Sequence, residues 1–350
     1  IPPGVPRRGD RIAAEGRVSG IEWLDRDVQT YYIAKDVSGF LFAGSADALQ
    51  PEGRGRMFTL FGWGDDLRGR FARAIDRGMG RPYSAVAGRM LLGNSVDIPE
   101  GIEEAFRDTG VIHVLVVSGF HVAALLGMFL MLAFFWRYNR WVTVAVVGAV
   151  LVVFYAVTGG GPSISRAVVM GFVLVASLTV RRDYDPLTAL CLAGLLLMAA
   201  NPNVVHNLGA QLSFLACLGI LVIYPQLRGL VPVSIHPLAQ RAIRAVLVSV
   251  SAQLPLYPLI AYQFNTVSLV SPFSNLVVAP LSGLAIPLGM LLCALGAVWS
   301  GFAVVFGPPV KAVVWLMIFF VKLFDSVPFA AVKVASPTAL SVALYAVFAW

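Results

Sequence analysis

The stretch that decides the fold is residues 111–136, which read VIHVLVVSGFHVAALLGMFLMLAFFW. It contains no Asp, Glu, Lys or Arg, and it is longer than the ~20 residues that a helix needs to cross a bilayer. Its first half nevertheless holds His113, Ser118, Gly119 and His121. Polar groups inside a span cost free energy unless they face protein, water or a ligand. We therefore predict a membrane helix with a polar face, directed either at the interface and a neighbouring helix or at a transport pathway.

The composition indicates that most of the chain lies in lipid. It is 58% hydrophobic and 13% charged, whereas soluble domains are about 25% charged. Residues 1–110 hold 16 of the 19 acidic and 15 of the 26 basic residues, so the net charge of +7 belongs to the remainder. Three cysteines fall in apolar runs without CxxC-like spacing, and we expect them to be packing residues rather than metal ligands or disulfides. They are Cys191, Cys217 and Cys293.

Residues 1–66 are predicted to form a small all-β domain. Short β-like runs separated by turn residues occur at 11–18, 28–35, 39–43 and 57–62. Several short strands in succession are typical of a closed barrel of the OB type. Such barrels often bind single-stranded nucleic acid on an aromatic face, but alternating aromatic residues in strands equally form a core. The domain is therefore expected to be OB-like, and both interpretations of its aromatic residues stay open.

Residues 67–110 are predicted to form amphipathic and linker helices at the membrane surface. Their apolar positions recur at helical spacing from Leu67, and arginines cover the rest of the helix. A basic amphipathic helix beside a membrane domain can lie on lipid headgroups. The same residues could instead form a phosphate-attracting collar where DNA enters a channel. The arginines are Arg68, Arg70, Arg73, Arg77 and Arg81.

Residues 111–350 are predicted to be a multi-span domain with broken helices. Apolar runs indicate spans near 111–136, 141–157, 163–180, 186–200, 204–224 and 245–262, with further runs at 310–321 and 338–350. No charge or histidine occurs between residues 245 and 310. Two or three membrane segments must share that length, and we expect Pro272, Pro280 and Pro287 to break it. Broken helices survive in a membrane only where protein or a wet cavity satisfies the freed backbone groups.

Basic residues in the short loops predict the orientation. Arginines follow the first, third and fifth spans, whereas the loops at 158–162, 201–203 and 263–266 contain no Lys or Arg. This alternation places the basic loops in the cytoplasm and residues 1–110 on the extracytoplasmic side.

Four motifs in order resemble the ComEC family of competence membrane proteins. The stretch H-V-L-V-V-S-G-F-H at 113–121 resembles H-L-L-x-x-S-G-L-H, and G-A-Q-L-S-F-L-A at 209–216 resembles G-F-Q-L-S-F-x-A. The other two are S-R-A at 165–167 and the pair Q-L-P at 253–255 with S-P-F-S-N-L at 271–276. The order and spacing agree over roughly residues 83–287, and residues 1–66 resemble the family's external OB-like domain more weakly.

The resemblance implies import of single-stranded DNA across the bacterial cytoplasmic membrane during natural transformation. It also implies a cytoplasmic ATP-driven DNA translocase and external DNA-receptor or pilus components as partners. Family members often carry additional N-terminal spans and a C-terminal metallo-β-lactamase-like nuclease domain. This chain begins at the barrel, ends at Trp350, and contains neither the H-x-H-x-D-H ligand set nor a G-x-x-x-x-G-K-[ST] loop. We therefore expect no enzymatic activity, metal or cofactor here.

A conduit for DNA must replace phosphate hydration with donors and still bind weakly. Arg166 is the only Lys or Arg well inside a span before residue 300. It either contacts the DNA, or snorkels, or pairs with a carbonyl or Asp183. For Gln211, Gln253 and Asn275, hydrogen bonds between helices are the alternative to a pathway role. The expected channel-lining residues are Ser163, Arg166, Gln211, Ser213, Gln253 and Asn275.

The histidine motif at 113–121 allows three interpretations. Ser118 and His121 share a helical face, as a serine hydrolase requires, but no acid lies nearby in the sequence to orient the histidine. A metal ion shared by His113 and His121 would need a break at Gly119, because eight residues span ~12 Å of helix. We therefore prefer a polar hinge that packs against residues 253–287.

Two other classes of function remain open. A secondary transporter of a small anionic solute would also use broken helices and polar residues at the midplane, although no clear internal repeat is present. An intramembrane enzyme is disfavoured by the missing acid and metal sets.

Overall fold

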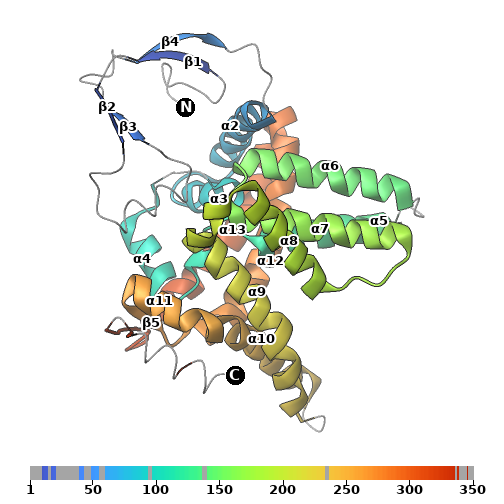
Figure 1. Ribbon diagram of the computed structural model, residues 1–350, viewed down its shortest axis with the longest axis vertical. Coiled ribbons are helices and arrows are strands. Elements are labelled where there is room, and N and C mark those ends of the chain that lie inside the picture. Colours follow the sequence, from blue (N-terminus) through green and yellow to red (C-terminus); the bar gives the residue numbers. More distant parts are fainter. Residues whose placement is uncertain are drawn as a thin grey trace.

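The computed structural model describes residues 10–14, 17–20, 39–42, 49–54, 60–93, 97–135, 140–232, 236–335, 337, 338 and 345. Most of these residues are helical, and the long helices form one body with the N-terminal strands beside it (Figure 1). Six helical segments are long and apolar enough to cross a membrane, at 141–158, 162–180, 208–230, 237–264, 271–298 and 300–325. The chain is thus a multi-pass membrane protein by the length and composition of its helices.

The strands of the N-terminal part form two antiparallel pairs. Strand β1 (Asp10–Ala14) pairs with β4 (Leu49–Arg54), and β2 (Arg17–Gly20) pairs with β3 (Gly39–Phe42). Among the described residues these are two separate two-stranded sheets, so the expected closed barrel is not seen there. The strand predicted at 28–35 lies outside the described residues.

The strand predicted at 57–62 is wrong from Leu60 onward, because helix α2 (Leu60–Met79) begins there. One face of α2 buries Gly64, Phe71, Ala74, Ile75 and Met79, a spacing that only a helix can bring to one side. The helix expected from Leu67 therefore starts seven residues earlier. Helix α2 contacts α6 (Arg140–Thr158), α12 (Ser271–Val298) and α13 (Ser300–Asp325), so part of the segment 67–110 belongs to the core.

The first predicted span is shorter than expected. Residues 111–118 form the 3₁₀ turn η2 (Ile112–Val114) and irregular chain, and helix α5 (Gly119–Phe135) begins at Gly119. The Ser118 amide donates to the His121 ring instead of continuing a helix toward Val111. Just before this segment, Gly110 has a φ of +71°, a left-handed conformation that ends helix α4 (Glu100–Asp108).

The predicted breaks at Pro280 and Pro287 are also wrong. Helix α12 runs through both prolines, and α13 likewise contains two prolines. A proline removes one backbone hydrogen bond, but neighbouring helices can satisfy the freed carbonyl inside a membrane protein. Pro272 does mark a helix start, because it occupies the first turn of α12, where its missing N–H costs nothing.

The predicted spans between residues 163 and 262 agree with helices, and one of them is divided. The run at 310–321 lies within α13, whereas the run at 338–350 lies almost wholly outside the described residues. Helices α7 (Pro162–Val180), α8 (Pro186–Ala200) and α9 (Leu208–Leu227) follow in order, with the turn η3 (Pro202–His206) before α9. The predicted span at 245–262 consists of α10 (Pro237–Gln253), the turn η5 (Leu254–Leu256) and α11 (Tyr257–Phe264). Strands β5 (Thr266–Ser268) and β6 (Ala331–Lys333) pair after α11.

Five helices contact one another in a closed order, which we call the five-helix ring. Helix α5 contacts α7, α7 contacts α9, α9 contacts α10, α10 contacts α12, and α12 contacts α5. Helices α6 and α7 lie side by side and extend to one side of the body, whereas α9 and α10 extend below it (Figure 1). Each member of the ring carries at least one of the residues that the sequence singles out.

Candidate functional site

Arg166 lies inside the helical body, one turn from the start of α7. The helix begins as expected, with Gly161 before it and Pro162 in its first turn. The arginine is 7% exposed. Its Nε donates to the Ser213 hydroxyl at 2.9 Å, its Nη1 lies 3.4 Å from the Met170 sulfur, and its Cζ lies 5.8 Å from the centre of the Phe214 ring. The guanidinium therefore bridges α7 and α9.

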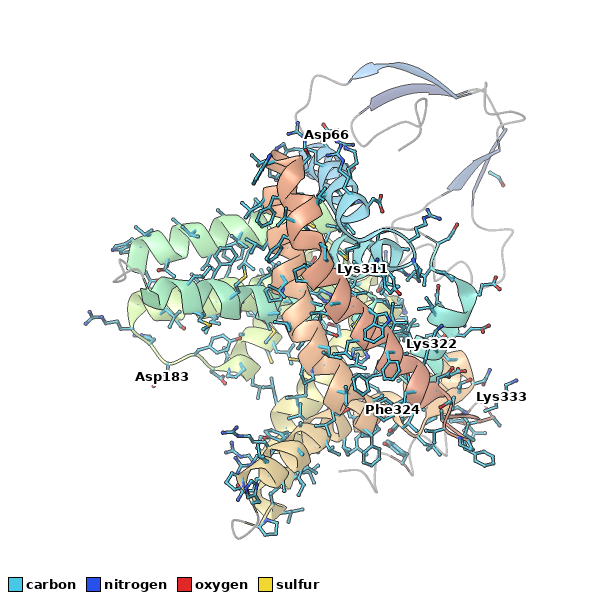
Figure 2. The ribbon with its side chains drawn as sticks, turned by 180° about the vertical axis from the view of Figure 1, so that it is seen from behind. Asp66, Asp183, Lys311, Lys322, Phe324 and Lys333 are labelled. Carbon is cyan, nitrogen blue, oxygen red and sulfur yellow. The ribbon has the colours of Figure 1, made fainter. Side chains whose placement is uncertain are left out.

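No carboxylate balances this buried charge within the part of the chain that the structure describes. The ion pairs there involve Arg68, Arg89 and Arg107. Asp183, the predicted structural partner, follows the other end of α7, ~25 Å away at ~1.5 Å per residue. Figure 2 shows Asp183 at the outer edge of the molecule. Pairing of Arg166 with Asp183 is thus wrong, and neutral groups surround the arginine, the Cys217 side chain among them.

Gly119 brings the histidine motif to the arginine. A Cβ built on Gly119 would lie 2.5 Å from Arg166 Nη2, so any larger residue would displace the guanidinium. The glycine also stands at the first position of α5. The motifs around Gly119 and Arg166 are 47 residues apart in the sequence. They nevertheless meet at one point, where Ser213 is the third residue.

Ser118 and His121 form a local structure at the start of α5. His121 is fully buried, its Nδ1 accepts the Ser118 amide at 3.2 Å, and it lies 3.3 Å from the Ser118 hydroxyl. The His121 Nε2 is buried near the Met90 carbonyl and makes no hydrogen bond of ordinary geometry. His113 is exposed in η2. No three His, Cys, Asp or Glu side chains gather in the described ranges in a way that could hold a metal. The hinge role stays a prediction.

Two predicted residues fasten the start of α9. The Ser163 hydroxyl donates to the Gly209 carbonyl at 2.9 Å and so joins α7 to α9. The Gln211 amide donates to the Val205 carbonyl at 2.8 Å and holds the preceding turn η3. Ser163 and Ser213 therefore tie α7 to α9 at two levels, whereas Gln211 ties α9 only to the turn that precedes it.

A polar cluster joins α10 to α12. The Gln253 amide donates to the hydroxyls of Ser249 and Ser271 at 2.8 and 2.9 Å, and the Asn275 amide donates to Ser249 at 2.9 Å. Tyr257 donates to Gln253 Oε1 at 2.9 Å. The interpretation of Gln253 and Asn275 as interhelical hydrogen-bonding residues is confirmed. Asn275 Oδ1 is nevertheless buried without a partner.

The cluster continues to the loop that precedes the histidine motif. Ser274 donates to the Thr109 carbonyl at 2.8 Å, and Ser271 lies 3.5 Å from the Gly110 carbonyl. Helix α12 is therefore fastened to α10 and to the end of α4.

Some polar residues escaped the sequence analysis. Ser249 and Ser271 were missed as members of a cluster, although the signal was present. Ser249 precedes Gln253 by four residues and Ser271 precedes Asn275 by four, and such pairs share a helical face. Lys311 lies within α13, with its Nζ 5.1 Å from the centre of the Tyr83 ring (Figure 2).

The basic residues of α2 divide into two groups. Arg68 is half-buried, donates to the Val157 carbonyl near the end of α6, and pairs with Asp65 at 3.2 Å. A cation at this position also interacts favourably with the helix dipole. The exposed members are Arg70, Arg73 and Arg77, and Arg81, which follows the end of α2, is exposed as well.

These features define a class: a multi-pass membrane protein whose helices meet around buried polar side chains and, among the described residues, a buried arginine without a carboxylate partner. Comparison with known proteins is more specific. Residues 90–350, about three quarters of the chain, match the family described as competence protein. The chain belongs to this family.

Two relatives support the assignment. The chain is 27% identical over 194 residues to "ComE operon protein 3" of Bacillus subtilis (strain 168), which covers 55% of this chain and 24% of that protein. It is 33% identical over 203 residues to an uncharacterized protein of Aquifex aeolicus (strain VF5), covering 57% and 44%. The chain thus spans less than half the length of either relative. No solved structure matches it.

Proposed function

We propose that this chain conducts single-stranded DNA across the bacterial cytoplasmic membrane in natural transformation. Membership of the competence protein family supports this proposal. The observation that carries it is Arg166, a buried arginine without a carboxylate partner among the described residues, placed where α5, α7 and α9 meet. A buried charge is expensive in a membrane protein, and such residues commonly mark a substrate or ion pathway.

The chemistry around Arg166 suits a strand that must keep moving. Each phosphate of single-stranded DNA carries a charge that needs donors in place of water. One cation surrounded by neutral groups such as the Ser213 hydroxyl would hold a phosphate without trapping it, because conduction requires weak and successive binding. In this proposal the hydrogen bonds of Ser163, Gln211, Gln253 and Asn275 hold the helices that shape the same path.

We place residues 1–110 on the extracytoplasmic side, where the exposed arginines of α2 would attract the phosphates of approaching DNA or of lipid headgroups. Arg68 is excluded from that role because α6 already engages it. Receptor or pilus components would deliver the DNA from outside, and a cytoplasmic ATP-driven translocase would supply the energy.

The test uses cells that take up DNA and carry this chain as the single copy. Arg166→Gln should lower the amount of labelled DNA that reaches the cytoplasm by about tenfold or more, since loss of one charge-assisted contact costs several-fold in affinity. DNA bound outside should not change. Arg241→Gln removes the same charge from an exposed position at the start of α10 and serves as the control. Normal internal DNA in cells with stable Arg166→Gln protein would contradict the proposal.

A carrier for a small anionic solute is the second candidate, because one buried arginine also fits one anionic group. Import of labelled inorganic phosphate or a small carboxylate into vesicles that contain only this chain would favour it. DNA import that depends on Arg166, without such anion transport, would favour the conduit.

A further inference from the structure

The environment of Arg166 is asymmetric. The Nε faces Ser213 and the Nη1 faces Met170, both neutral. The Phe214 ring lies against the guanidinium and against Gly194 of α8, which fixes the outer side of the arginine. The remaining nitrogen, Nη2, is directed at Gly119 on α5. The Arg166 guanidinium is therefore held by Ser213 and Phe214 of α9, and its Nη2 lies against α5.

An aromatic side chain follows Gly119 immediately. Phe120 is 42% exposed although it belongs to the first turn of α5. The tip of its ring, Cζ, points toward Gly283 of α12 and lies 3.6 Å from the position that a Cβ on this glycine would take. Its ring is perpendicular to that of His121, so it does not stack on the histidine. The tip of the ring is therefore directed at α12, and a large part of the side chain is uncovered.

The neighbouring positions on this face of α5 are small or also exposed. Val116, in the segment just before α5, is 54% exposed. On the helix, Ala123 and Gly127 are exposed, and nothing lies within 4 Å of the position of a Cβ on Gly127. The opposite face of α5 is packed, because Val122, Leu125 and Leu126 are buried. The uncovered face thus includes Phe120 and lies beside Gly119, against which the Arg166 guanidinium packs.

We infer that Arg166 and Phe120 form a binding position for one nucleotide unit, in which Nη2 of the arginine contacts a phosphate and the Phe120 ring stacks on the neighbouring base. Proteins that bind single strands without sequence preference combine cations along the backbone with aromatic platforms for bases. Bases stacked and paired inside a duplex cannot reach such a platform. The position therefore favours a single strand of any sequence. This inference rests on the proposed function and specifies its substrate contact.

The test measures binding to the full chain, purified in nanodiscs of zwitterionic lipid. The probes are a short fluorescent oligothymidylate and an abasic strand with the same number of phosphates. Phe120→Leu keeps an apolar side chain against Gly283 but removes the ring. It should weaken binding of oligothymidylate about fivefold or more and leave the abasic strand unaffected. Arg166→Gln should weaken both probes by a similar factor.

A charge-preserving change probes the geometry. Gly119→Ala would place a methyl group 2.5 Å from Nη2, so it should displace the guanidinium and weaken both probes without altering the net charge. If that protein does not fold, Arg166→Lys, which cannot reproduce the planar fork, should weaken both probes partially. Phe319→Leu removes an aromatic ring of similar exposure from α13 and should change neither.

Two results would overturn the inference. One is an effect of Phe120→Leu on both probes, or on neither, which would leave Phe120 as a lipid contact. The other is loss of oligonucleotide binding on addition of anionic phosphatidylglycerol with no dependence on Phe120, which would make the site one for lipid headgroups. The inference and the proposed function can fail separately. Unchanged binding of both probes to Phe120→Leu, with DNA import still dependent on Arg166, removes the nucleotide position and keeps the conduit. If oligonucleotide binding changes as expected but DNA import is normal in Arg166→Gln cells, the nucleotide position stands and the conduit proposal fails.

Discussion

Single side chains close the ends of several membrane helices. Asp185 accepts the amides of Leu187 and Thr188 at 3.3 and 3.0 Å before α8, and Asn207 accepts the amide of Ala210 at 3.1 Å before α9. The first N–H groups of a helix have no partner within the helix, and near a membrane few other groups can bind them. Each cap therefore sets where its helix begins.

The cap at Asp185 should make stability depend on pH. Hydrogen bonds from the Thr188 hydroxyl and then from the Thr188 amide lower the pKa of this carboxyl below its ordinary value of 3.8. Because the folded-state pKa is the lower one, the contribution is present above the ordinary pKa and is lost as pH falls through the folded value. Asp185→Ala should lower thermal stability at neutral pH, and the difference from the unmodified protein should shrink below about pH 4.

Asp185→Asn is the matched control for this prediction, since asparagine also caps helices but does not titrate in this range. It should keep most of the stability, with a smaller dependence on acid pH. A difference between Asp185→Ala and the unmodified protein that stays constant from neutral to acid pH would contradict the assignment.

Close contacts at glycine determine how the helices pack. Gly307 of α13 lies against the backbone of Gly78 in α2, and Gly219 of α9 lies against the Ser251 carbonyl in α10. Lipid tails are as apolar as the side chains, so association in a membrane relies on close packing rather than on removal from water. Small residues allow the backbones of α2 and α13 to touch, and this contact makes α2 part of the helical core.

Gly307→Ala should separate α2 from α13. A methyl group there would overlap the Gly78 backbone, and overpacking of this kind costs about 1–3 kcal/mol. The measurement is the temperature at which the folded protein disappears from size-exclusion chromatography. Gly127→Ala adds the same methyl group where nothing lies within 4 Å, so its unfolding temperature should be unchanged or slightly higher. Equal behaviour of the two variants would show that the α2–α13 contact is not close.

At the scale of the whole molecule, the loop without Lys or Arg after α6 and the arginine-containing loop after α7 lie in different places. The turn between α6 and α7 has no Lys or Arg and lies against the N-terminal helices. Gly160 is close to Phe61 of α2, and the Thr158 carbonyl lies near Gly93 at the end of α3 (Tyr83–Leu92). The arginine-containing loop between α7 and α8 lies at the outer edge instead (Figure 2). This separation supports the orientation that the basic residues predict.

Cysteine labelling would test the orientation. In a background with Cys191, Cys217 and Cys293 replaced by alanine, a membrane-impermeant maleimide should label Asn203→Cys in intact cells, because the uncharged loops are predicted to lie outside. Arg182→Cys should react only after the membrane is opened. Reversed labelling of the two positions would invert the proposed topology and move the N-terminal part to the cytoplasm.

The sequence by itself determined the class of the protein, the approximate positions of most spans, and the isolated polar residues within them. Apolar runs and isolated polar residues depend only on the cost of placing each group in lipid, which composition reveals. Helix starts were predictable where a local cap exists, as at Pro162 and Asp185. The paired polar residues at a spacing of four in α10 and α12 could have been found in the same way.

Only the tertiary structure decided which of these residues meet. It placed Nη2 of Arg166 against Gly119, carried α12 unbroken through Pro280 and Pro287, and turned residues 60–62 from an expected strand into helix. Each outcome depends on groups distant in the sequence. They are the helix that faces a glycine, the neighbouring groups that can donate to the carbonyl freed by a proline, and the helices that bury one face of α2. Local patterns specify what a segment can form, whereas contacts between segments select one alternative, because only those contacts supply the compensating free energy.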